Sequence, residues 1–173
     1  PDLLMVKRSE QHPTDQADLF GKRLVVCQET EEGKRLNESL VKQLTGGDGI
    51  RARRMREDFW EFEPTHKIWL STNHKPEIRG TDHAIWRRIR IIPFNVKFHD
   101  PGEGTPVKDT GMEAKLTAEL PGILNWAING CLDWQRQGLK APEIVQAATE
   151  GYRQEMDVLS AWISDCCIVK KHC

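Results

Sequence analysis

The sequence predicts a mixed α/β fold that continues into an all-helical region. Two short apolar runs, residues 23–27 and 66–70, each lead into polar side chains, which is typical of strands in an α/β sheet. Between them, residues 50–62 alternate with period two, which indicates a β-hairpin. Beyond residue 112 the apolar side chains recur at helical spacing. A length of 173 residues fits one domain, or one domain with a small helical appendage.

The composition excludes several classes of protein. No apolar run approaches the ~18 residues that a membrane-spanning helix needs. The first ten residues lack the apolar stretch of a signal peptide. Five cysteines, an odd number without framework spacing, indicate a reducing compartment, so we expect a cytoplasmic protein without a membrane partner. The net charge of −1 means that any nucleic-acid binding must come from a local patch.

The first predicted strand, residues 23–27, follows a short helix predicted over residues 14–20. Its β-branched apolar side chains are typical of a buried strand. The chain then enters a polar cluster, residues 28–33, which contains Glu29. Ligands in α/β folds bind beyond the carboxyl ends of the strands, so Glu29 is a candidate site residue. A solvated acidic turn would explain the same cluster.

A helix is predicted over residues 36–44, because its apolar side chains lie three and four positions apart. Asn37 or an earlier residue is a candidate for its N-cap, and the glycine-rich residues 45–49 end it.

The hairpin over residues 50–62 is strongly basic. Phe59 and Trp60 lie in its second half, and four arginines gather within six residues of its first half: Arg51, Arg53, Arg54 and Arg56. Such a cluster beside aromatic rings suits phosphate contact and base stacking. A solvated hairpin whose arginines pair with local acids is equally consistent with the pattern.

The second predicted strand, residues 66–70, also ends in polar side chains, among them Asn73. If the two strands are parallel neighbours about 4.8 Å apart, Glu29 and Asn73 emerge side by side at one edge.

A short helix capped by Thr81 or Asp82 is predicted next, and it leads to the pair Arg87 and Arg88. Three isoleucines after this pair predict a third strand: Ile89, Ile91 and Ile92. Paired arginines at this position could also be an exposed cap or members of salt bridges.

The C-terminal part is predicted to form three packed helices, over residues 121–137, 142–153 and 157–166. A glycine- and proline-rich stretch precedes them. We therefore divide the chain into a core of residues 1–97, a linker of residues 98–112 and a helical subdomain of residues 113–173.

In this order the segments resemble the helicase region of phage and plasmid primase–helicases. These are superfamily 3 helicases, a ring-forming branch of the AAA+ ATPases. The resemblance runs from about residue 12 to residue 94 and is carried by five stretches: residues 21–29, 42–48, 62–65, 72–76 and 86–94. Weaker similarity continues at residues 120–126 and 152–157.

The resemblance implies a partial AAA+ sheet of the P-loop NTPase type, with ATP and Mg²⁺ as cofactors. It implies that Glu29 is the Walker B acid and a metal ligand, and that Asn73 is sensor 1. Arg88, or its neighbour Arg87, would be the arginine finger that reaches the ATP of an adjacent subunit. The partners would be single-stranded DNA and further copies of the chain in a ring, expected to be a hexamer, in a bacterium or a phage-infected host. The hairpin arginines and, as a lesser candidate, Lys42 would contact the DNA.

The sequence departs from this family in two respects. Many members of the wider superfamily have two adjacent acids in Walker B, whereas this sequence has the pair Gln28-Glu29. Glu31 is a candidate to assist Glu29. A Gly-x-x-x-x-Gly-Lys-Ser/Thr loop is absent, and the pairs Gly21-Lys22 and Gly33-Lys34 each precede an arginine. We expect that loop to precede residue 1, which would make this chain an inactive fragment of a longer enzyme.

The missing loop would also remove a central strand of the sheet. We expect the fragment to close the resulting gap by rearrangement, by self-association or by pairing of residues 2–6. A non-catalytic nucleic-acid-binding module, using the hairpin and the helical tail, is the alternative function.

Overall fold

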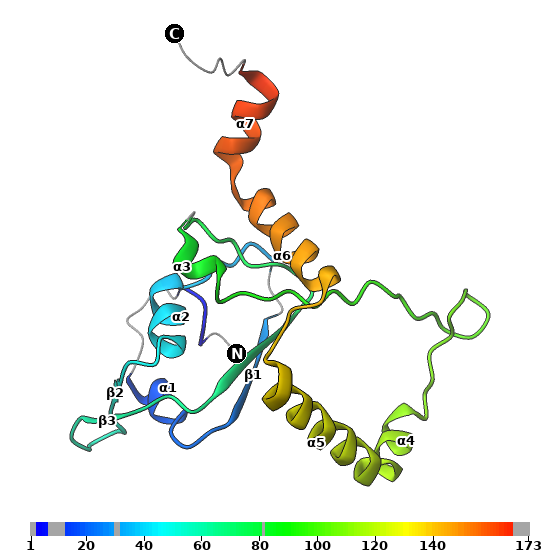
Figure 1. The fold of residues 1–173 in the computed structure, drawn as a ribbon, viewed down its shortest axis with the longest axis horizontal. Helices are drawn as coiled ribbons and strands as arrows, with labels where there is room; N and C mark the ends of the chain where they lie inside the picture. Colours follow the sequence, from blue (N-terminus) through cyan, green and yellow to red (C-terminus); the bar gives the residue numbers. More distant parts are fainter. Residues whose placement is uncertain (1–2, 7–12, 30–31, 81, 168–173) are drawn as a thin grey trace. The chain divides into compact units, whose positions relative to one another are not determined.

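The computed structural model describes residues 3–6, 13–29, 32–80 and 82–167 of the chain (Figure 1). It divides into two compact units, one made of residues 1–90 with 149–173 and the other of residues 91–148. The mixed α/β class is confirmed, since helices and two small sheets are both present. The predicted short N-terminal helix is present as α1 (Pro13–Ala17).

Strands β1 (Leu24–Glu29) and β4 (Lys67–Thr72) form a two-stranded parallel sheet (Figure 1). The register pairs Leu24 with Lys67 at one end and Glu29 with Thr72 at the other. This confirms that the two predicted strands are parallel neighbours. Parallel strands need a long crossover connection, and the chain between β1 and β4 supplies it with a helix and a hairpin.

The hairpin consists of β2 (Ile50–Ala52) and β3 (Trp60–Phe62), which pair antiparallel. Ile50 and Ala52 are fully buried, whereas Arg51 between them is exposed. The period-two alternation in the sequence therefore separates a core face from a basic face, as predicted.

Helix α2 (Glu38–Thr45) begins at the predicted cap, because the Asn37 side chain accepts a hydrogen bond of 3.1 Å from the Leu40 amide. Its apolar face is buried and packs against α3 (His83–Trp86). Asp82 caps α3 by accepting a hydrogen bond of 3.0 Å from the Ile85 amide, while the alternative cap Thr81 lies outside the described residues.

The N-terminal segment pairs at a different place from the one predicted. Met5 bridges Leu36 in antiparallel fashion, and Arg35 bridges Glu77 in parallel fashion. The segment therefore caps the start of α2, and the edge of β4 opposite β1 has no strand partner in the described ranges.

The prediction of a third strand, from Ile89, Ile91 and Ile92, is wrong. Residues 89–98 contain no strand, although Ile92 and Phe94 lie in them with exposed side chains. A strand needs a neighbouring strand to form a sheet with, and within the described residues the two sheets contain only β1 with β4 and β2 with β3.

Three of the C-terminal helices match the predicted segments: α5 (Leu120–Gln137), α6 (Glu143–Met156) and α7 (Val158–Cys166). An additional helix, α4 (Met112–Ala118), was not predicted. No residue of α4 or α5 is buried, so the packing of the three predicted helices with one another stays a prediction. None of the helices in the described ranges is long and apolar enough to cross a bilayer.

Candidate functional site

The carboxyl ends of β1 and β4 bring two predicted site residues to one edge of the sheet. Glu29 is the last residue of β1 and lies opposite Thr72, and Asn73 follows Thr72 directly. The description covers the backbone of Glu29 but not its side chain, and Glu31 lies outside the described residues. The side chain of Asn73 is exposed at this edge. The backbone thus sets the two residues side by side, as the sequence predicts for parallel neighbours.

The turn after β4 holds Asn73 at the end of the strand. The hydroxyl of Thr72 donates a hydrogen bond of 2.8 Å to the His74 carbonyl, and the His74 amide donates one of 3.1 Å back to that hydroxyl. This small ring closes around Asn73, so its side chain leaves the strand at a defined point. A threonine that bonds its neighbour's backbone in this way is a common device for turns.

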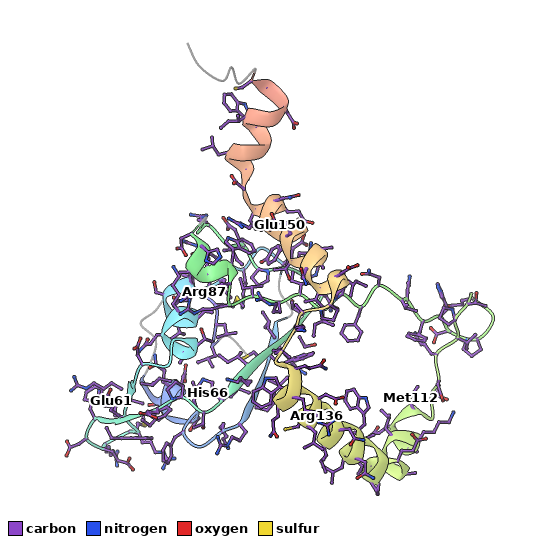
Figure 2. The ribbon with its side chains drawn as sticks, viewed as in Figure 1. Glu61, His66, Arg87, Met112, Arg136 and Glu150 are labelled. Atoms are coloured by element: carbon purple, nitrogen blue, oxygen red, sulfur yellow. The ribbon has the colours of Figure 1, made fainter. Side chains whose placement is uncertain are left out.

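Arg87 and Arg88 have different surroundings at the end of α3. Arg88 is held in place, because its Nε donates to Thr45 Oγ1 at 3.1 Å and its Nη1 donates to the Ala84 carbonyl at 2.6 Å. Arg87 caps the helix with its backbone amide, while its side chain is exposed (Figure 2). Within the described residues the Arg87 guanidinium has no hydrogen-bond or ion-pair partner.

The hairpin arginines are exposed and, within the part of the chain described, none of the four forms an ion pair. Glu61 lies directly across from Arg51 in the register. Its carboxylate lies against Gly49, where an added Cβ atom would clash with Glu61 Oε1. The local salt bridges expected of a merely solvated hairpin are thus not formed by its nearest acid.

Two of these arginines flank one aromatic ring. The guanidinium carbons of Arg51 and Arg53 each lie 4.7 Å from the centroid of the Phe59 ring, and that ring is 45% exposed. Trp60, the other aromatic residue considered for stacking, packs instead against Phe20 and Phe62. Its ring centroid lies 4.8 Å from that of Phe20 and 5.0 Å from that of Phe62. Phe59 is therefore the ring that this hairpin presents to solvent.

Comparisons with known proteins place this geometry in a family context. Residues 4–88 match a model described as "Family of unknown function (DUF5906)". The chain is 30% identical over 177 residues to "Putative helicase L207/L206" of Acanthamoeba polyphaga mimivirus, covering 94% of this chain and 18% of that protein. It is 29% identical to "Putative helicase 022R" of Frog virus 3, covering 84% of this chain and 16% of that protein.

A further relative is named for priming. The chain is 32% identical to "Putative primase C962R" of African swine fever virus (strain Badajoz 1971 Vero-adapted), covering 85% of this chain and 16% of that protein. The chain is a homologue of helicase- and primase-named proteins of large DNA viruses. The predicted kinship with primase–helicases is confirmed. The chain spans less than a fifth of the length of these relatives.

Lys42 is engaged in an ion pair within the fold. Its Nζ lies 2.7 Å from Asp82 Oδ2, and this hydrogen bond, together with the one from the Ile85 amide, holds the pKa of Asp82 below its ordinary value. The pair links α2 to the cap of α3. A DNA contact by Lys42 stays a prediction, and it would compete with this ion pair.

The sheet edge fits Mg²⁺ with ATP in part. The described residues contain no group of three or more His, Cys, Asp or Glu side chains that could hold a metal ion. Mg²⁺ in nucleotide sites needs only one or two protein carboxylates, with water and phosphate oxygens completing its shell, so Glu29 alone suits that role. A phosphate-binding loop of the expected sequence is missing from the chain.

The sequence reasoning missed His66 at the start of β4. Its side chain, labelled in Figure 2, is only 5% exposed, and neither ring nitrogen has a hydrogen-bond partner among the described residues. Burial lowers the pKa of His66. The nearby Leu44 carbonyl opposes this shift by favouring the protonated ring, and the neighbouring Lys67 charge lowers the pKa again.

Proposed function

We propose that this chain is part of an ATP-driven replicative DNA helicase that works as a homo-oligomeric ring on single-stranded DNA. The observation that carries the proposal is the parallel register of β1 and β4, which sets Glu29 and Asn73 at one edge of the sheet. A protein that only binds nucleic acid needs neither an acid nor an amide at the ends of paired strands. The names of the viral relatives support a role in replication.

Glu29 and Asn73 would have different roles in nucleotide hydrolysis at this edge. When bound, ATP with Mg²⁺ supplies the phosphoanhydride bond whose cleavage drives movement. The Glu29 carboxylate would hold the metal or polarise the attacking water. The Asn73 amide would orient that water or a terminal phosphate oxygen, which suits a neutral donor and acceptor on a defined turn.

Arg87 is the better of the two candidates for the arginine finger. A finger must leave its own subunit to reach a neighbour's nucleotide, and the Arg87 side chain is exposed and unpaired among the described residues. Arg88 is bonded to Thr45 and Ala84, so it would position the end of α3 instead. Arginine fingers raise rates by about 10³–10⁵ in other phosphoryl-transfer enzymes.

The hairpin would hold one DNA strand inside the ring. Its four arginines are exposed and have no ion-pair partner within the described residues, so they are available to phosphates. Phe59, with Arg51 and Arg53 over its ring, would offer a stacking surface for a base. The triphosphate would need a phosphate-binding loop from residues other than those described.

Hydrolysis by the longer protein that contains this chain tests the proposal. Glu29→Gln keeps the size of the side chain but removes its charge, and it should lower DNA-stimulated ATP hydrolysis by about 100-fold or more. Glu32→Gln makes the same change three residues away and should leave turnover near the wild-type rate. Unchanged turnover in Glu29→Gln would refute the enzymatic proposal.

A non-catalytic nucleic-acid-binding module is the second candidate, and the exposed hairpin favours it, since DNA contact by arginines needs no nucleotide. The two candidates differ in their response to ATP. The module would bind DNA equally with and without ATP, and Glu29→Gln would leave it unaffected.

A further inference from the structure

Tyr152 of α6 contacts two segments that lead to predicted site residues. It is 3% exposed, and its hydroxyl donates a hydrogen bond to the Pro76 carbonyl. Its ring meets Trp86 edge to face, with ring centroids 5.3 Å apart and an angle of 81° between the planes. Pro76 belongs to the turn that carries Asn73, and Trp86 is the last residue of α3, directly before Arg87.

A second pair from the same face of α6 secures the turn. The Lys75 ammonium lies 2.9 Å and 2.7 Å from the two carboxylate oxygens of Glu155, and 5.4 Å from the centroid of the Tyr152 ring. Residues three apart on a helix share a face, so Tyr152 and Glu155 meet the turn together. Two successive residues of the turn, Lys75 and Pro76, are thus held by one turn of helix.

The chain between the turn and α3 is tied down as well. The Trp86 indole Nε1 donates a hydrogen bond of 2.9 Å to the Gly80 carbonyl. The Glu38 carboxylate accepts hydrogen bonds of 3.0 Å from the amides of Arg79 and Gly80. An added Cβ atom at Gly80 would clash with Glu38 Oε2, so a larger residue there would displace the carboxylate that accepts these two bonds. Because these bonds fix the segment between the turn and α3, a displacement of the turn should be passed on to α3.

We propose that Tyr152 is a positioning residue that couples the Asn73 turn to Arg87. If the turn shifts, the buried hydroxyl must either follow Pro76 or lose its acceptor, and leaving a buried hydroxyl unpaired is unfavourable. When the ring follows, its contact with Trp86 carries the shift to the end of α3. In the proposed ring, this would link the sensor of one nucleotide site to the finger that enters the next, so this inference rests on the proposed function.

The hydroxyl can be separated from the packing of the ring. Tyr152→Phe keeps the edge-to-face contact with Trp86 and removes only the bond to Pro76. Glu155→Gln removes the charge that pairs with Lys75 and leaves Tyr152 in place. Glu150→Gln is the matched control on α6, because Glu150 is exposed and, among the described residues, bonds to neighbours on its own helix alone.

Amide NMR spectra of the whole chain test the coupling without any need for catalysis. Asn73→Ala should shift the amide signals of Arg87 and Arg88, and in the Tyr152→Phe background that response should fall by at least half. In the Glu150→Gln background the response should remain. An equal response with and without the Tyr152 hydroxyl, or no response of Arg87 in the wild-type background, would overturn the coupling.

Kinetics of the longer protein add a readout that loss of packing alone would not give. At a temperature where all variants are folded, Tyr152→Phe should lower kcat by about three- to tenfold, the factor that one hydrogen bond supplies, with KM for ATP unchanged. A rise in KM with kcat unchanged would contradict a positioning role. If Asn73→Ala and Arg87→Ala leave hydrolysis unchanged while the NMR coupling holds, the proposed function fails and the coupling stands.

Discussion

His66 shows how one buried side chain makes stability depend on pH. Burial lowers its pKa in the folded chain below the ordinary value of 6.5, so the unfolded chain binds a proton more readily. Above about pH 6.5 the ring is neutral in both states, and His66 adds no pH dependence. Below that pH, stability is lost until the pH has fallen through the pKa of the folded state.

We expect urea unfolding to give a lower free energy of unfolding at pH 5.5 than at pH 8, with part of this difference due to His66. His66→Leu should reduce the difference, whatever it does to the stability at pH 8. The same substitution at His74, whose side chain is exposed, should leave the difference in place. A difference that is identical in the wild-type chain and in His66→Leu would contradict this explanation.

We expect substitution of Arg88 to affect stability and substitution of Arg87 to affect hydrolysis. Arg88→Ala removes one hydrogen bond that ties the end of α3 to Thr45 of α2 and one to the Ala84 carbonyl within α3, and it should lower the free energy of unfolding by about 1–3 kcal/mol. Arg87→Ala should leave the melting temperature within about one degree, since exposed side chains without partners contribute little. In the longer protein, Arg87→Ala should abolish hydrolysis even in subunits that retain Glu29. Thermal unfolding and turnover are measured on both variants. A larger loss of stability in Arg87→Ala than in Arg88→Ala, or a larger loss of turnover in Arg88→Ala than in Arg87→Ala, would contradict this division.

Among the elements, the hairpin is the one whose function is most readily tested. Arg51→Ala combined with Arg53→Ala should weaken binding to single-stranded DNA and reduce the slope of log affinity against log salt by about one to two. Fluorescence anisotropy with a labelled oligonucleotide measures both quantities. Phe59→Ala should weaken binding with less change in the slope, because stacking releases no counterions.

A matched control removes two arginines elsewhere. Arg90→Ala combined with Arg136→Ala makes the same change in net charge without touching the hairpin. If this control lowers affinity and slope as much as the hairpin variant does, general charge is responsible and the hairpin has no special role.

The elements that the sequence predicts best are those with local signals. The cap of α2 at Asn37 and the alternation of Ile50, Arg51 and Ala52 depend on neighbouring residues alone, and both are confirmed. The strand predicted from Ile89, Ile91 and Ile92 is wrong because a strand also needs a partner, which residue types cannot supply. Helix α4 was missed because its apolar side chains, such as Met112 and Leu116, are few and exposed.

At the scale of the whole molecule, the pairing of β1 with β4 depends on residues that are far apart in the sequence. Polar side chains after two apolar runs predicted that Glu29 and Asn73 share an edge only on the condition that the strands are parallel neighbours, and the register meets that condition. Other features could not be predicted in this way. The hydrogen bond from Tyr152 to Pro76 joins residues 76 positions apart, and no local sequence pattern predicts such a contact. The pairing of Arg51 and Arg53 with the Phe59 ring likewise required the folded hairpin.

The central claim is that Glu29 and Asn73 act on the same nucleotide, and a double-mutant cycle on single-turnover ATP hydrolysis by the longer protein tests it most directly. If both residues serve one reacting phosphate, Glu29→Gln and Asn73→Ala should each slow hydrolysis, and the double variant should be little slower than the more severe single variant. Effects that multiply fully, or a rate unchanged by either substitution, would contradict the account.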